Sequence, residues 1–139
     1  GEFWFDINRY EKSRSTFIIN RYLPTSELVW LIRNSFYVVT PYRDATHSAV
    51  IATAYAFNKP VVATNVDGLS EVVIHNFTGK LVNPGDSDAL TEALKDMNQQ
   101  DLKLKDFEKN IKEIRDHGKL SWDKLIKDYR AVYQETIAN

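Results

Sequence analysis

Two short and almost uninterrupted apolar runs constrain the fold of this chain more than any other feature. They lie at residues 36–40 and 60–64, and both are rich in valine. A strand that is covered on both faces is apolar throughout, as in a parallel sheet. Between the two runs, residues 48–57 are rich in alanine and apolar all round, which predicts a buried helix ended by Asn58 in the left-handed conformation. The pattern therefore predicts a parallel α/β unit.

Weaker signals extend this unit on both sides. Pro24 followed by Thr25 or Ser26 predicts a helix start, and Asn34 and Ser35 its end. Alternation and β-branched residues predict further strands at 2–6, 15–19 and 80–82, with a short helix at 71–74 and a longer one after Asp86 or Ser87. The tail carries two amphipathic helices that divide at His117 and Gly118. We expect one domain, with a doubly wound, Rossmann-like α/β core at 1–100 and C-terminal helices at 101–139.

Composition excludes several functional classes. The 18 Lys and Arg residues are interleaved with 19 Asp and Glu residues, so no broad basic surface for nucleic acid is predicted. Cysteine is absent, which excludes disulfides and a thiolate nucleophile. No apolar run approaches the length of a membrane span, and we expect a cytoplasmic protein. His47, His75 and His117 are far apart in the sequence, so we predict no metal site.

The loops that follow the predicted strands are the candidate ligand sites, because ligands of open parallel sheets bind beyond the carboxyl ends of the strands. Residues 41–48 join a buried strand to a buried helix, so their last amides and the positive helix end would favour an anion such as phosphate. Thr46, His47 and Ser48 add side-chain donors. The alternative is structural: Thr46 or Ser48 only caps the helix, and His47 only faces solvent.

A second loop, at residues 65–71, places Gly68 where backbone can approach a ligand closely. Glu71 lies in the first turn of the short helix that follows. It could hold ligand hydroxyls or merely complement the helix dipole.

Four segments resemble the donor-binding domain of GT-B glycosyltransferases, specifically the large retaining family four, which includes sucrose, mannosyl and lipopolysaccharide-type transferases. The similarity runs from about Phe17 to Met97. Residues 21–28 resemble the family's strand end and next helix, and Lys59-Pro60-Val61-Val62-Ala63-Thr64 resembles "GKPVVAT". Asp67-Gly68-Leu69-Ser70-Glu71-Val72-Val73 and Thr78-Gly79-Lys80-Leu81-Val82-Asn83-Pro84-Gly85-Asp86 resemble "GGLPEVV" and "TGxLVxPGD".

The resemblance implies transfer of a sugar from a nucleotide-diphosphate sugar with retention, and it implies neither cofactor nor metal. The implied donor-binding residues are Thr46, His47, Ser48, Thr53, Asp67, Gly68, Leu69 and Glu71. The family's two signature glutamates fall at Ala45 and Thr53, so both are missing and Thr53 offers ribose only a hydroxyl. Residues 45–48 instead resemble a subgroup variant, approximately "ATQSG". We therefore assign no residue a catalytic role, and the catalytic residues stay unknown.

The resemblance also implies partners outside this chain. The family's acceptor-binding domain and the phosphate-binding loop of its first strand do not align here, so we expect an acceptor glycan or lipid-linked sugar to bind elsewhere in the protein. We expect this chain alone to be inactive, to expose a sheet edge prone to self-association, and to belong to an enzyme that can act at the membrane surface. The alternatives are a noncatalytic nucleotide- or phosphate-binding module or a degenerate transferase.

Overall fold

A three-stranded parallel sheet forms the centre of the chain in a computed structural model, which describes residues 16–99, 101–118 and 121–137. The strands are β1 (Val38–Thr40), β2 (Val61–Thr64) and β3 (Gly79–Val82), in the order β1-β2-β3. The helices are α2 (Thr25–Arg33), α3 (Ala49–Ala56), α4 (Leu69–Val72), α5 (Ser87–Gln99), α6 (Asp101–Asp116) and α7 (Trp122–Ile137). Val61 of β2 is in register with Val38 on one side and Gly79 on the other. The predicted α/β, Rossmann-like fold with a parallel sheet is confirmed.

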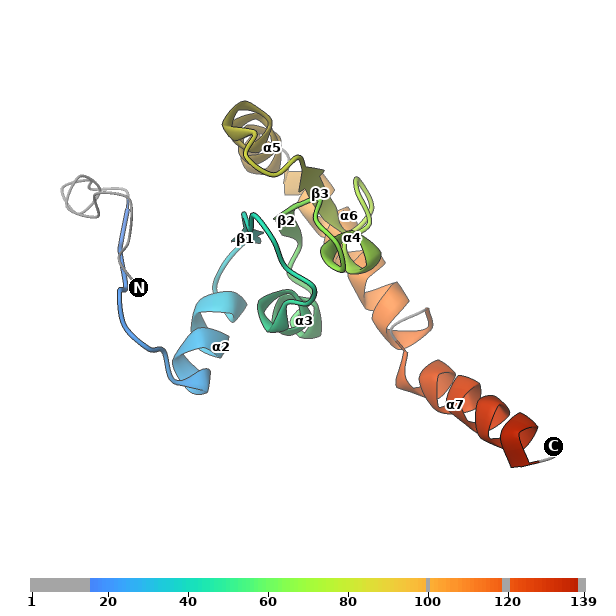
Figure 1. Cartoon of the computed structure of the whole chain (residues 1–139). Coiled ribbons are helices and arrows are strands. Elements are labelled where there is room, and N and C mark those ends of the chain that lie inside the picture. The colour runs from blue at the N-terminus through green and yellow to red at the C-terminus, as the bar shows by residue number, and fades with distance from the viewer. Residues whose placement is uncertain (1–15, 100, 119–120, 138–139) are drawn as a thin grey trace.

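The two faces of the sheet bury different sets of side chains, because successive residues of a strand point to opposite faces. Val61 and Ala63 belong to a cluster with α2, α3 and α4, whereas Val62 belongs to a second cluster with α5. Figure 1 shows α5 on one side of the sheet, and α2 and α3 on the other. Helix α6 contributes Leu104 and Phe107 to the second cluster and Ile111 to the first. Helices therefore cover both faces, as the apolar strands require.

Local sequence explains where the helices begin and end. Pro24 immediately precedes α2, and the Ser48 hydroxyl caps α3 by accepting a hydrogen bond from the N–H of Ile51 at 3.3 Å. Asp86 Oδ1 accepts from the N–H of Ala89 at 2.8 Å at the start of α5. Asn58 follows α3 with a φ of 57°, in the left-handed conformation predicted for it. These starts and ends agree with the sequence prediction.

The strand predicted at 15–19 is wrong for its described part, because residues 16–20 contain no strand. Phe17 is 88% exposed, and a strand persists only where a neighbour takes up its backbone hydrogen bonds. The predicted strand at 36–40 begins later, at Val38, and Phe36 is 78% exposed. Helix α4 begins two residues earlier than predicted. The strand predicted at 2–6 lies outside the described residues.

Helix α6 begins beside the sheet, and α7 extends away from it (Figure 1). Helix α6 is anchored by Arg115, whose guanidinium donates to Ala56 O at 3.1 Å and to Asn58 Oδ1 at 2.7 Å. Helix α7 follows the buried Ser121 and exposes Tyr129 and Tyr133. Within the described ranges, none of the helices combines the length and apolar character that crossing a membrane would need.

Candidate functional site

The three loops that follow β1, β2 and β3 leave the same edge of the sheet, because the strands are parallel. The loop after β1 runs through residues 41–48 to the start of α3. The loop after β2 leads through Gly68 into α4, and the loop after β3 leads through Asp86 into α5. This carboxyl edge is where ligands of such sheets bind. The predicted donor-binding residues lie in the first two loops and in α4, which follows the second loop. Thr53 is the exception, because it lies one turn inside α3.

The loops are fastened to one another. The Thr64 hydroxyl donates to Tyr42 O at 2.5 Å, which ties the first loop to the end of β2. A Cβ atom added to Gly68 would lie 1.6 Å from Thr46 O, so only glycine allows the second loop to pack this closely against the first. Asn65 N–H donates to Val82 O at 2.7 Å, which continues the β2–β3 ladder beyond β2. The geometry of one loop therefore depends on the others.

A hollow of about 310 Å³ lies where the first loop meets α4. It brings together four of the predicted residues: His47, Ser48, Gly68 and Leu69. The remaining lining comes from Ala49, Ile51, Ala52 and Val72. Its size is at the lower end of small-ligand pockets, which span about 300–1,000 Å³. The hollow thus combines an apolar wall with the polar start of a helix.

The individual residues of this hollow have different roles. Ser48 is the cap of α3, which is the structural alternative considered from the sequence. The Ser48 hydroxyl accepts the hydrogen bond from the N–H of Ile51. In the first turn of α3, the N–H groups of Ala49 and Val50 are therefore left without an acceptor within the helix. His47 is exposed beside them, whereas Leu69 is only 1% exposed and packs into the core as a wall. The chemistry available here is donation from backbone and an imidazole to an anion or hydroxyl.

The other predicted residues do not line the hollow. Thr46 is exposed and meets Gly68 through its backbone carbonyl. The Thr53 hydroxyl donates to Ala49 O at 2.7 Å within α3, so only its lone pairs remain for a ligand. Asp67 and Glu71 are exposed at the surface. Glu71 lies in the first turn of α4, where it complements the helix dipole.

A second, smaller hollow of about 190 Å³ lies at the same edge and was missed from the sequence. It is lined by residues of the loops after β1 and β3, among them Arg43 and Asn83, and by Thr64 at the end of β2. Arg43 is the only Lys or Arg in the three segments 41–48, 65–71 and 83–86. That count is available from the sequence alone. It marks Arg43 as the source of positive charge in these loops.

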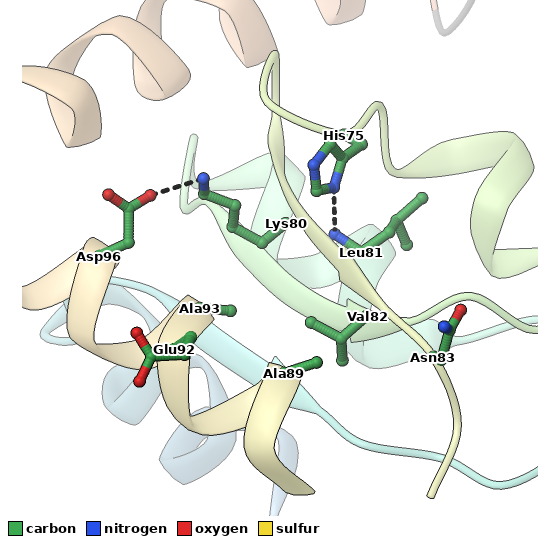
Figure 2. A pocket seen from close by; sticks show the side chains of 9 residues that line it. All are labelled: His75, Lys80, Leu81, Val82, Asn83, Ala89, Glu92, Ala93 and Asp96. Carbon is green, nitrogen blue, oxygen red and sulfur yellow. Dashed lines mark hydrogen bonds and ion pairs between the residues drawn. The ribbon is translucent and has the colours of Figure 1, made fainter. Parts of the chain in front are cut away.

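A third hollow lies on the outer side of β3, away from the predicted residues (Figure 2). His75 Nδ1 accepts the N–H of Leu81 at 3.0 Å, and Lys80 pairs with Asp96 at 2.5 Å. The hydrogen bond from Lys80 lowers the pKa of Asp96, and Lys103 adds to this effect. The Lys80–Asp96 pair joins β3 to α5, and the His75 bond holds the segment before β3 against that strand, so these contacts have a structural role. In the described part of the chain, no three His, Asp or Glu side chains gather closely enough to hold a metal.

Comparison with known proteins decides the family. The family profile described as "Glycosyl transferases group 1" matches residues 8–100, which is more than half of the chain. This chain belongs to the group 1 glycosyl transferases. An uncharacterized glycosyltransferase of Methanocaldococcus jannaschii is 33% identical to it over 109 residues. The match covers 78% of the group 1 chain and 30% of that relative, so the chain spans about a third of the relative's length.

Two solved structures resemble the fold of this group 1 chain. Sucrose-phosphate synthase from Thermosynechococcus elongatus superposes with a TM-score of 0.63 and 29% identity, covering 73% of this chain and 25% of the synthase. Anabaena HepE in complex with UDP superposes with a TM-score of 0.57 and 27% identity, covering 60% of this chain and 23% of HepE. The Rossmann-like architecture is therefore that of GT-B glycosyltransferases.

Proposed function

We propose that this group 1 chain is the donor-binding part of a retaining GT-B enzyme of family four, which transfers a sugar from a nucleotide-diphosphate sugar to an acceptor. One observation supports this most directly: His47 and Ser48, at the start of α3, share a hollow with Gly68 and Leu69 beyond the carboxyl ends of the strands. A similar structure, HepE, was solved with UDP. A nucleoside diphosphate carries the anionic groups that a helix start favours.

Each predicted residue has a role in this proposal. The N–H groups of Ala49 and Val50, together with Thr46, His47 and Ser48, would contact the diphosphate or the sugar. Helix amides and basic side chains would stabilise the leaving group, so the proposal includes no metal and no cofactor. The Thr53 hydroxyl would accept from ribose. The donor sugar would lie against the residues of the second loop and α4, namely Asp67, Gly68, Leu69 and Glu71.

A nucleotide titration tests the proposal on this chain. Addition of UDP should shift the amide NMR signals of residues 46–51 and 66–72 and leave those of α7 unchanged. The distant helix serves as the internal control, because a general effect of ionic strength would shift both regions. Unperturbed signals in both loops at saturating UDP would remove the basis for a donor site.

Ala45 and Thr53 support a second candidate, because they stand where family four has its two glutamates. A chain without these carboxylates could be a noncatalytic nucleotide- or phosphate-binding module, or a degenerate transferase. Both candidates predict UDP binding, so the titration does not separate them. Assaying the full-length protein with a panel of nucleotide sugars does: turnover of any donor supports the enzyme, and binding without turnover supports the module.

The remaining proposals concern parts beyond this chain. The acceptor, an acceptor glycan or lipid-linked sugar, would bind to a separate domain, as in a hexosyltransferase of polysaccharide biosynthesis acting in the cytoplasm or at the membrane surface. Catalysis needs both partners oriented in one cleft, so we expect no turnover by this chain alone.

Self-association would use the outer edge of β1, which has no neighbouring strand among the described residues and where Val39 is 38% exposed. Light scattering that shows a stable monomer would count against self-association.

A further inference from the structure

The loop that carries the predicted anion site is held at two of its carbonyl groups. Near its beginning, Tyr42 O accepts the hydroxyl of Thr64 at 2.5 Å. Four residues later, Thr46 O lies against the bare Cα of Gly68. Thr64 is only 4% exposed, so its hydrogen bond is shielded from competition by water. The segment between the two carbonyls cannot move unless one of these contacts is given up.

Only His47 and Ser48 separate the second contact from α3. The direction of the helix start, and the place of His47 on the rim of the hollow, therefore depend on where the loop is held. Hydrogen bonds to a ligand weaken steeply when donor and acceptor lose their alignment, so a small displacement of this start matters. The hydrogen bond from Thr64 to Tyr42 therefore affects the geometry of the ligand site. Thr64 itself lines the second hollow and not the one that His47 lines.

We propose that Thr64 is a positioning residue for the nucleotide, because its hydroxyl fixes the loop that presents His47 and the start of α3. The inference rests on the proposed function for its ligand. Removing the hydroxyl leaves the half-buried Tyr42 carbonyl without its donor. That carbonyl then turns toward water, because a buried acceptor without a partner is costly. The loop follows it, and His47 shifts relative to the hollow that it lines.

Three substitutions separate positioning from a general role in stability. Thr64→Val removes the donor and keeps the shape and volume, whereas Thr64→Ser keeps the donor and removes a methyl group. Thr64→Cys supplies a weak donor of similar size and takes the place of the valine variant if that variant does not fold. Thr91→Val is the matched control, since the Thr91 hydroxyl donates at 2.8 Å to Ser87 O on the exposed surface of α5. Urea unfolding establishes which variants are folded.

Two measurements on the whole chain test the proposal. The first is amide hydrogen exchange without ligand: Thr64→Val should accelerate exchange in residues 42–51 about fivefold or more, Thr64→Ser should resemble the wild type, and Thr91→Val should leave this segment unchanged. The second is UDP affinity by titration, which should fall about tenfold in Thr64→Val and be restored in Thr64→Ser.

The two arms also separate this inference from the proposed function. If the wild type does not bind UDP, the proposed function fails together with the nucleotide as ligand, and hydrogen exchange then decides only whether Thr64 holds the loop. Exchange in residues 42–51 that is unchanged in Thr64→Val overturns the positioning role, whatever the affinities are. The positioning role is also overturned if exchange is faster in Thr64→Val but its UDP affinity stays within twofold of the wild type.

Discussion

Replacing Gly68 by alanine perturbs the contact between the two ligand loops directly. Gly68 has a φ of +75°, where an L-residue is strained by about 1–3 kcal/mol. The added Cβ would also lie 1.6 Å from Thr46 O, and contacts below 3.0 Å essentially never occur. The loops must therefore separate by about 1.4 Å, the difference between 3.0 and 1.6 Å. A shift of this size should misalign the groups that face the hollow and weaken UDP binding about tenfold or more, the cost of about one charge-assisted hydrogen bond.

Gly85→Ala provides a matched control for the hollow where the first loop meets α4, because Gly85 lines only the second hollow, beside Arg43. Gly85 has a φ of +80°, so alanine incurs similar backbone strain there, but a Cβ would meet no atom within 4 Å. Urea unfolding should show a loss of about 1–3 kcal/mol for Gly85→Ala and a larger loss for Gly68→Ala. Calorimetric titration with UDP should show weakened binding only for Gly68→Ala. Equal UDP affinities for the two folded variants would refute the view that close packing of these loops shapes the site.

Three further substitutions test other parts of the structure. Burial raises the pKa of Tyr55 from its ordinary value of 10 to about 12, so its ionisation favours the unfolded chain. Its contribution to the free energy of unfolding should be complete below pH 10, be lower by about 2.3 kcal/mol at pH 12, and level off about 2.7 kcal/mol lower at still higher pH. Tyr55→Phe should abolish this fall in urea unfolding and cost about 1 kcal/mol at neutral pH, because the bond to Thr78 is lost. Arg43→Gln should weaken UDP binding severalfold and flatten its salt dependence, and an unchanged salt dependence would exclude a contact with the diphosphate. His75→Ala should accelerate exchange of the Leu81 amide about fivefold, whereas unaltered exchange would show that His75 does not protect the β3 edge.

Local patterns predicted those elements whose signals lie within a few neighbouring residues. The apolar run of β2 and the alanine-rich α3 are identified by composition, and the role of Ser48 follows from its position before that helix. The strand predicted near Phe17 failed because a strand also needs a hydrogen-bonding neighbour, which periodicity does not reveal. Pairing is a property of the tertiary structure. A local apolar pattern without a partner strand therefore remains irregular.

The candidate site was predictable in its position but not in its internal contacts. The loops after parallel strands could be named from the sequence because the fold class fixes where they emerge. The approach of Thr46 to Gly68 and the bond from Thr64 to Tyr42 each join residues 22 positions apart, which no local pattern encodes. Arg43 was overlooked for a different reason. Its charge was visible, but its place in a hollow depends on how the loops after β1 and β3 meet at the end of β2.

Helix α6 has a practical consequence for any shortened version of this protein. Leu104 and Phe107 complete the apolar cluster on one face of the sheet, and Ile111 completes the cluster on the other. A chain cut after α5 would lose cover from both faces at once, and the apolar side chains left exposed would favour aggregation. The smallest independently folding unit should therefore extend at least through α6, and protease cleavage near residue 100 should unfold the sheet rather than release an intact core.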